Sequence, residues 1–277
     1  MSRLEKLASK LGAFLCNYRG RVFADRINAS VHCLHQAINN VNYDMDTNGE
    51  FRALSIILEN NNRCVFDVGA NIGLWTQEVK SLAPNCDMHS FEIVPSTFQQ
   101  LKKNTSDLQG VKINDVGLSD ETGEIQINLG KYSTSSTAFK IDALKFHDNY
   151  YTDQVTCKTI LGSSYLESNG IESVDLLKID TEGMDLRVIR GFDLLLDRVK
   201  IIQFEYGIFN ISSHDLLGDY CHYLDKKGFR VGKIFPRHVD FFNYNWRNEN
   251  FYGGNYLAVR KSNQKLINAL KANSSNN

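Results

Sequence analysis

The stretch Val65-Phe-Asp-Val-Gly-Ala-Asn-Ile-Gly73 decides the fold class of this 277-residue chain. An apolar run, Cys64–Val68, leads directly into a glycine-containing turn, and a helical pattern opens after Gly73. Glycines in such a turn let the backbone approach a ligand closely, and the amides at the start of the helix face that ligand. Any doubly wound sheet also needs a tight turn here, so the stretch alone predicts the fold and leaves the ligand open.

Short apolar runs alternate with helical segments on the C-terminal side of this turn. Alternation of this kind indicates βαβ units and a parallel sheet. Helices are expected after Gly73, from Pro95, from about Met184 to Leu196, and from Ser213, as an N-cap, to Lys227. The runs expected as strands are Cys64–Val68, Met88–Phe91, Val111–Ile113, Val174–Ile179, Val199–Phe204, Phe229–Phe235 and Tyr256–Val259.

The remaining segments complete the predicted domain organisation. Residues 1–60 show apolar residues at helical spacing and are expected as a helical extension, before a domain at 61–261 and a tail at 262–277. Glu124–Leu129 alternates strictly and predicts an extra strand. Residues 130–154 and 236–255 are polar, aromatic-rich and aperiodic, so both are expected as long loops, which are usually functional or disordered.

Composition restricts the partners and the compartment of the chain. The net charge is −1, from 31 basic and 32 acidic side chains, so no global field attracts nucleic acid and no nucleic-acid partner is expected. The six cysteines form no Cys-x-x-Cys pair, which favours scattered reduced thiols. We see no signal peptide and no run of about 20 apolar residues, so we expect a cytoplasmic protein without a transmembrane segment.

Acidic residues at the ends of the first two strands indicate the kind of cofactor. The turn has the spacing Gly-x-x-x-Gly, not the Gly-x-Gly-x-x-Gly of dinucleotide sites. The Asp67 carboxylate, expected to face the pocket, suits an ammonium group better than a pyrophosphate, and S-adenosylmethionine carries an ammonium and no phosphate. Glu92 closes the second strand, where it can accept hydrogen bonds from both ribose hydroxyls. Asp115–Asp120 follow the third strand and are expected beside the adenine.

Several of these segments together resemble the FkbM family of methyltransferases. The matching strings are Phe66–Gly73, Phe91-Glu-Ile-Val-Pro95, Gly117-Leu-Ser-Asp120 and the distinctive Leu177-Lys-Ile-Asp-Thr-Glu-Gly183, which Asp185 follows. The resemblance implies a Rossmann-like class I methyltransferase fold, with a seven-stranded sheet whose last strand is antiparallel and S-adenosylmethionine over the carboxyl ends. The expected cofactor-binding residues are Asp67, Gly69, Ala70, Asn71, Gly73, Glu92, Asp115 and Gly117.

The string Asp180-Thr-Glu-Gly carries the candidate catalytic chemistry. It follows a buried strand, so Asp180 and Glu182 should face the crevice beyond the sheet. Methylation of a hydroxyl benefits from a general base, and repulsion between two close carboxylates raises the pKa of one. The alternatives are that Asp180 caps the next helix while Glu182 favours its dipole, or that both hold a divalent cation with an acceptor diol. A structural ion pair is expected for Lys178.

Histidines are weaker candidates. His147 and His214 lie in or beside loops after strands, so either is an alternative base, although a lone loop histidine is usually solvated. His32 and His35 are three apart on an expected helix, but no carboxylate accompanies them, so surface or core roles are favoured over metal ligation.

The acceptor prediction depends on the two long loops. Residues 236–255 interleave aromatic and polar side chains, a composition that suits the binding of sugar rings. Tyr244 and Trp246 are expected as the stacking platforms. Ser135 and Thr137, from residues 130–154, are expected to close the acceptor site from the other side. Packing of these aromatics on the sheet, or in a homodimer interface, is the alternative. We therefore expect O-methylation of a carbohydrate or glycosylated small molecule. Other readings are methylation of a lipid or another natural product, and an NAD-dependent oxidoreductase.

Overall fold

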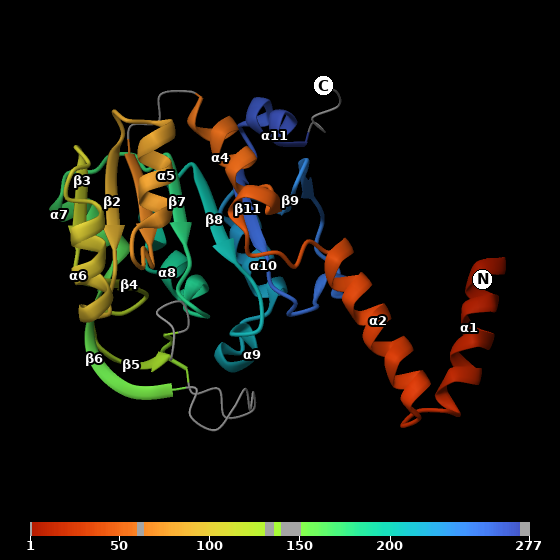
Figure 1. Cartoon of the computed structure of the whole chain (residues 1–277). Helices are drawn as coiled ribbons and strands as arrows, with labels where there is room; N and C mark the ends of the chain where they lie inside the picture. The colour runs from red at the N-terminus through yellow and green to blue at the C-terminus, as the bar shows by residue number, and fades with distance from the viewer. Residues whose placement is uncertain (1, 60–63, 131–135, 140–150, 272–277) are drawn as a thin grey trace. The chain divides into compact units, whose positions relative to one another are not determined.

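The computed structural model describes residues 2–59, 64–130, 136–139 and 151–271. It divides into two units, Met1–Val41 and Asn42–Asn277. The first unit contains two helices, α1 (Arg3–Cys16) and α2 (Val22–Ile38) (Figure 1). It is shorter than the expected extension over residues 1–60, because residues from Asn42 onward belong to the second unit. None of the helices within the described ranges is long and apolar enough to cross a membrane.

An eight-stranded sheet forms the centre of the second unit. Its strand order is β10-β9-β11-β8-β7-β1-β2-β3, and β11 runs antiparallel to both of its neighbours. The predicted Rossmann-like α/β fold is therefore confirmed, including the antiparallel last strand. The strands are β1 (Cys64–Val68), β2 (Asp87–Phe91), β3 (Val111–Asn114), β7 (Leu176–Ile179), β8 (Ile201–Glu205), β9 (Phe229–Phe235), β10 (His238–Phe241) and β11 (Asn255–Arg260).

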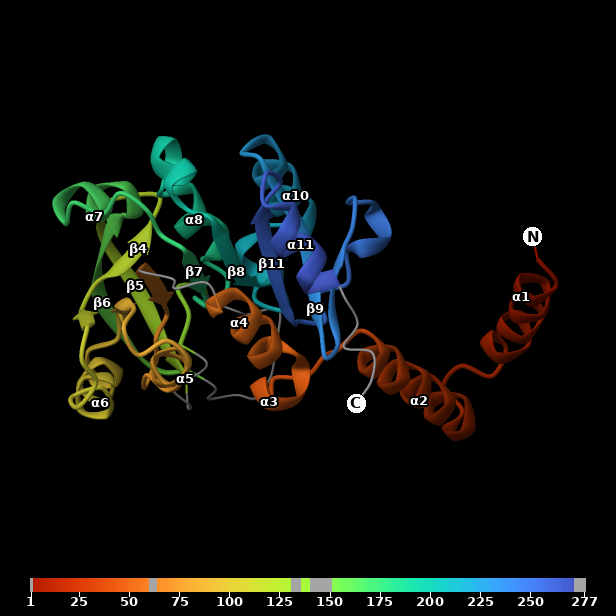
Figure 2. The same cartoon turned by 90° about the horizontal axis from the view of Figure 1, so that it is seen from above.

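Helices cover both faces of this sheet because its central strands are apolar on both sides. Along β1, for example, Val65 packs into one core cluster and Phe66 into the other. Figure 2 shows α4 (Glu50–Leu58) and α5 (Leu74–Leu82) on one side, and α7 (Gly162–Ser168), α8 (Asp185–Arg190) and α10 (Leu217–Lys226) on the other. The helix α11 (Gln264–Lys271) packs into the same cluster as α4. The remaining helices are α3 (Met45–Asn48), α6 (Pro95–Asn104) and α9 (Asn210–Ser213).

A second, three-stranded sheet lies beside the carboxyl end of β3. Its order is β4-β6-β5, from β4 (Gly117–Ser119), β6 (Tyr151–Leu161) and β5 (Gly123–Gly130). The strand predicted at Glu124–Leu129 is thus confirmed as β5. The strand β6 was not predicted from the sequence and begins inside the expected loop 130–154. Residues 131–135 and 140–150 of that loop lie outside the described ranges.

Three other predictions differ from the structure. The sheet has eight strands and not seven, because β10 forms a hairpin with β9 inside the expected loop 236–255. The helix expected to Leu196 ends at Arg190 and is followed by a 3-10 helix, η2 (Asp193–Arg198). Gly191, between the two, lies against the carbonyl group of Ser119. Ser213 is not an N-cap: α10 begins at Leu217, where the Asp219 carboxylate accepts from the amide of Leu216.

Candidate functional site

The turns after β1 and β7 touch one another at the carboxyl edge of the sheet. Gly69 has a φ of +81°, and a Cβ at this position would overlap the carbonyl oxygen of Asp180. Only glycine satisfies both constraints, the positive φ and the close approach. Asn71 also has a positive φ, of 49°, and its backbone amide points toward the end of β2.

Glu92, directly after β2, accepts a hydrogen bond from that amide. Its carboxylate accepts from the backbone N–H of Asn71 at 2.9 Å and of Val94 at 2.8 Å. Burial raises the pKa of Glu92, although these two hydrogen bonds act in the opposite direction. The side chain is therefore held in one orientation, with lone pairs left for a further donor.

A mostly apolar cavity opens beside Glu92. Val68 and Phe91 line it from the main sheet, Ile93 from the turn after β2, and Leu118, Ile125 and Ile127 from the small sheet. We call it the Glu92 cavity. Its apolar walls suit a flat heterocycle, and the carboxylate of Glu92 suits a sugar hydroxyl.

Thr137 joins the small sheet to the turn after β7. This side chain is buried, lines the Glu92 cavity and donates to the carbonyl oxygen of Glu182 at 2.8 Å. Thr137 was predicted as an acceptor-binding residue, and the structure shows that its hydroxyl holds the backbone of the turn. Gly117 also lines this cavity, whereas Asp115 is exposed and lines neither cavity described here.

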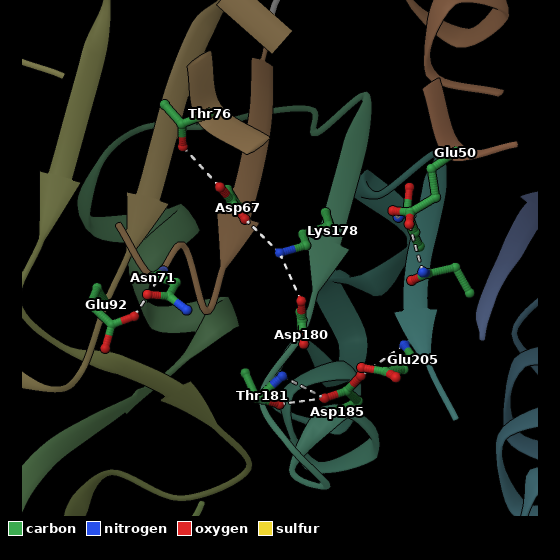
Figure 3. Close-up of polar contacts among 12 residues, drawn as sticks. Glu50, Asp67, Asn71, Thr76, Glu92, Lys178, Asp180, Thr181, Asp185 and Glu205 are labelled. Carbon is green, nitrogen blue, oxygen red and sulfur yellow. Dashed lines mark hydrogen bonds and ion pairs between the residues drawn. The ribbon is translucent and has the colours of Figure 1, made fainter. Parts of the chain in front are cut away.

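Asp67 is placed differently from the prediction. Its carboxylate is fully buried and lines neither cavity, so it does not face the pocket. It accepts from the Thr76 hydroxyl at 2.8 Å and lies 3.1 Å from the Lys178 Nζ, which lies 3.3 Å from Asp180 (Figure 3). Burial acts to lower the pKa of Lys178, but the two carboxylates raise it further than burial lowers it. The expected ion pair of Lys178 is confirmed, and Asp67 reaches the cavity only through Lys178.

Asp185 fixes the turn that carries Asp180 and Glu182. The buried carboxylate accepts from the Thr181 amide at 2.9 Å and from the Thr181 hydroxyl, and it accepts from the Glu205 amide at 3.0 Å (Figure 3). Burial raises its pKa to about 6. Asp180 does not cap α8, since the cap position is Met184 and no side chain bonds there. The capping alternative for Asp180 is therefore wrong.

A second cavity on the other side of this turn is lined by acidic side chains. We call it the Glu205 cavity; its carboxylates are Glu50, Asp180, Glu182, Asp185 and Glu205. Burial, and then the neighbouring carboxylates, raise the pKa values of Glu182 and Glu205 well above the usual range. Neither of these two carboxylates accepts a hydrogen bond from the described residues. Glu182 also has a positive φ of 52°, an uncommon conformation for a non-glycine residue.

The two cavities meet at the turns themselves. Gly69, Asn71, Asp180 and Glu182 line both. A ligand lying across these residues would have one end in the apolar Glu92 cavity and the other in the acidic Glu205 cavity. Ala70 lines only the Glu205 cavity, and Gly73, with a φ of +91°, begins α5 and lines neither.

Glu50 and Glu205 are not among the site residues expected from the sequence. Glu205 closes the apolar run of β8 just as Glu92 directly follows the apolar run of β2, so the same signal, an acid directly after an apolar run, could have identified it. Glu50 had no such signal. It lies at the start of α4 and accepts from Asn48, Gln203 and Asn255, which only the fold brings together.

The aromatic loop does not lie at either of these cavities. Tyr244 lines a separate pocket beside α10 and donates to Glu249 at 2.8 Å, and Trp246 is 72% exposed. Phe241 is buried in the core and Phe242 packs against it, so part of the loop packs on the sheet. Tyr244 and Trp246 therefore lie away from the Glu92 and Glu205 cavities, and the acceptor platform expected of them stays a prediction.

The histidine candidates gain no support. His214 is exposed, in a left-handed conformation, and lines neither cavity. His147 and Ser135 lie outside the described residues. Across the part of the chain that the structure describes, no group of three or more His, Cys, Asp or Glu side chains is arranged to hold a metal ion.

Comparison with known proteins identifies the family. Residues 67–231 match the model of the methyltransferase FkbM domain. The hexuronic acid methyltransferase AglP of Haloferax volcanii is 28% identical over 160 residues, covering 57% of this chain and 62% of AglP. The 2-O-methyltransferase NoeI of Sinorhizobium fredii is 21% identical, covering 56% of this chain and 68% of NoeI. The 31-O-demethyl-FK506 methyltransferase FkbM of Streptomyces tacrolimicus is 26% identical, covering 47% and 59%.

The match spans the structural features described above. It begins at Asp67 in β1, includes the turns after β1, β2, β7 and β8, and ends in β9. The chain spans about six tenths of the length of AglP. Because the family model covers more than half of the chain, the predicted resemblance is confirmed: the chain belongs to the FkbM methyltransferase family.

Proposed function

We propose that this protein is an S-adenosylmethionine-dependent O-methyltransferase, with the cofactor lying across the turns shared by the two cavities. The observation that carries the proposal is the meeting of an apolar cavity and an acidic cavity at Gly69, Asn71, Asp180 and Glu182. The adenosine would occupy the Glu92 cavity, with Glu92 accepting from the ribose hydroxyls. S-adenosylmethionine, when bound, supplies an electrophilic methyl group on a sulfonium.

Two buried polar atoms suit the amino-acid end of that cofactor. Asn71 Oδ1 and Trp75 Nε1 have no hydrogen-bond partner among the described residues, and both side chains line the Glu205 cavity. A buried polar atom without a partner costs about 1–3 kcal/mol. An ammonium can donate to Asn71 Oδ1, and a carboxylate can accept from Trp75 Nε1, so a zwitterionic amino acid satisfies both.

The remainder of the Glu205 cavity would take the acceptor hydroxyl. Asp180 is ion-paired with Lys178, whereas Glu182 and Glu205 are free of hydrogen bonds from the described residues and have raised pKa values. A carboxylate with a raised pKa accepts a proton from a hydroxyl more readily near neutral pH. We therefore assign the general base to the Glu182–Glu205 pair, with Asp180 and Lys178 supporting the turn.

The acceptor class that we propose is a carbohydrate or a glycosylated small molecule. Aromatic side chains (Tyr43 and Phe209) and amides (Asn210 and Asn255) line the Glu205 cavity together with the carboxylates. Aromatic faces stack on sugar C–H faces, and carboxylates and amides bond the hydroxyls. AglP and NoeI, by their names, methylate a hexuronic acid and a 2-O position, which is consistent with this class.

A methyl-transfer assay tests the proposal. It measures transfer of a labelled methyl group from S-adenosylmethionine to a panel of neutral methyl glycosides, glycolipids and aglycones. Calorimetry with the cofactor alone comes first, because a protein that binds NAD and not S-adenosylmethionine would contradict it outright. Labelling of a sugar hydroxyl is the expected result. Full activity in EDTA would favour the carboxylate base over the alternative of a cation held by Asp180 and Glu182.

A further inference from the structure

The first unit, Met1–Val41, exposes two apolar helix faces. On α1, Leu7, Leu11 and Phe14 are each more than half exposed. On α2, the exposed apolar residues recur every three or four positions, so they share one side of the helix: Phe23, Ile27, Val31, Leu34 and Ile38. No other part of the first unit covers these faces within its described residues, and an exposed apolar surface of this kind marks an interaction site.

The charge of this unit is opposite to that of the rest of the protein. Its charged side chains are Arg3, Lys6, Lys10, Arg19, Arg21 and Arg26 against Glu5 and Asp25, a net charge of +4. Because the whole chain carries −1, the remaining residues carry −5. A basic, amphipathic pair of helices therefore precedes an acidic domain, and the asymmetry favours an anionic partner for the first unit.

A groove near the turn between α1 and α2 combines apolar side chains with positive charge. Tyr18, Phe23 and Ile27 line it together with Arg21 and Arg26. In this part of the described chain neither arginine pairs with a carboxylate, since Asp25 instead accepts from the backbone amide of Gly20. Two free guanidinium groups beside aromatic and aliphatic side chains suit a phosphate whose substituent is apolar, as at the boundary between lipid headgroups and acyl chains.

We propose that Met1–Val41 binds the surface of an anionic lipid bilayer. Helices of 14 and 17 residues with a basic polar side and an apolar side lie in the interface plane and do not span the membrane. The same apolar faces could pair with a second copy, but two units of +4 repel one another, whereas an anionic surface attracts both. The unit would hold this methyltransferase at the membrane.

Co-sedimentation of the full chain with vesicles tests this proposal. Vesicles of phosphatidylcholine with 30% phosphatidylglycerol should bind the protein, and vesicles of phosphatidylcholine alone should not. The double variant Arg21→Gln, Arg26→Gln should lower partitioning by roughly thirty-fold, since each basic residue near an anionic surface contributes about a five-fold factor. Ile27→Ser with Leu34→Ser should abolish binding. The matched controls are Arg237→Gln and Leu194→Ser, at exposed positions of the second unit.

Two results would overturn the inference. One is failure of the unmodified chain to sediment with anionic vesicles at low salt. The other is a dimer in light scattering that dissociates in the Ile27, Leu34 variant, since a second copy would then cover these faces. The arginine variant keeps the apolar faces intact, so it reports on lipid binding even where the serine variant alters the helices. Circular dichroism shows whether the serine variant has kept its helices.

Discussion

Single acidic residues at strand ends define the candidate site of this FkbM-family protein. Glu92 directly follows β2 and Glu205 ends β8, and each carboxylate meets a cavity at the same edge of the sheet. Their surroundings differ, because Glu92 accepts two backbone amides and Glu205 accepts none from the described residues. This contrast is consistent with a binding role for Glu92 and a proton-accepting role for Glu205.

Glu92→Gln should weaken S-adenosylmethionine binding while the fold is kept. Glutamine retains one acceptor oxygen but loses the charge, and a hydrogen bond to a charged group contributes ~1.5–3 kcal/mol. We expect calorimetry to show a loss of about 10- to 150-fold in affinity. A thermal unfolding curve is the control, because Glu92 also holds the amides of Asn71 and Val94. Unchanged affinity in a folded variant would remove Glu92 from the cofactor site.

Glu205→Gln should lower turnover and leave cofactor affinity nearly unchanged. A positioned general base contributes roughly 10²–10⁴-fold, and the partner Glu182 would retain part of this. The pKa of Glu205 is raised, so the acidic limb of the kcat profile should move in the variant. Glu124→Gln, at an exposed position on β5, is the matched control. Asp180→Asn tests the prediction from sequence; if it alone abolishes turnover, Asp180 is the base.

At the scale of the elements, the site depends on the contact between the turns after β1 and β7. Gly69→Ala introduces a methyl group into the space of the Asp180 carbonyl group and requires a positive φ from alanine. The conformational strain alone costs about 1–3 kcal/mol, before the clash is counted. We expect a lower melting temperature and loss of cofactor binding together. Gly123→Ala, which meets no neighbour within 4 Å, should leave both unchanged; equal behaviour of the two variants would refute the close approach.

The loop between β10 and β11 provides a test of the acceptor site. Trp246 is 72% exposed and lines neither cavity, so Trp246→Ala should change neither the melting temperature nor the KM for an acceptor. Phe209→Ala removes an aromatic wall of the Glu205 cavity and should raise that KM. If the KM rises in the Trp246 variant and not in the Phe209 variant, the acceptor binds at the loop that carries Trp246 and not in the Glu205 cavity.

At the scale of the whole molecule, the buried carboxylates should make the protein more stable in mild acid. The pKa of Asp185 is about 6 in the fold against a usual 3.8, so the folded state binds its proton more tightly. Its contribution to stability is full below about pH 4 and is lost as the pH rises through 6. Glu182 and Glu205 shift in the same direction. His89, whose pKa burial lowers to about 4, acts in the opposite direction between pH 6.5 and 4.

The melting temperature should therefore rise as the pH falls from about 6 to about 4. Asp185→Asn should flatten this dependence, and Asp193→Asn, at an exposed carboxylate, should not. A melting temperature that falls steadily over the same range in the unmodified protein would contradict the assignment of these groups as buried and repulsive.

The sequence by itself determined most of the strands and helices of the fold and several acidic residues of the site. Apolar runs, glycine turns and strand-end acids are local signals, so the seven main strands, β5, the helices after Gly73 and Pro95, and Glu92 could all be predicted. Asp180 and Glu182 were identified because they follow a buried strand. A local pattern is sufficient wherever burial on both faces of a strand dictates the residue type.

Only the tertiary structure decided where charged side chains point and what they meet. Asp67 follows the same strand pattern as Glu92, yet Lys178 and Thr76 hold its carboxylate inside the protein. Glu50 reaches the Glu205 cavity from a helix that the sequence places in the extension before the domain. The aromatic loop has the composition of a binding surface but lies elsewhere. Composition states which contacts a segment can make, whereas the packing of distant segments selects the contacts that form.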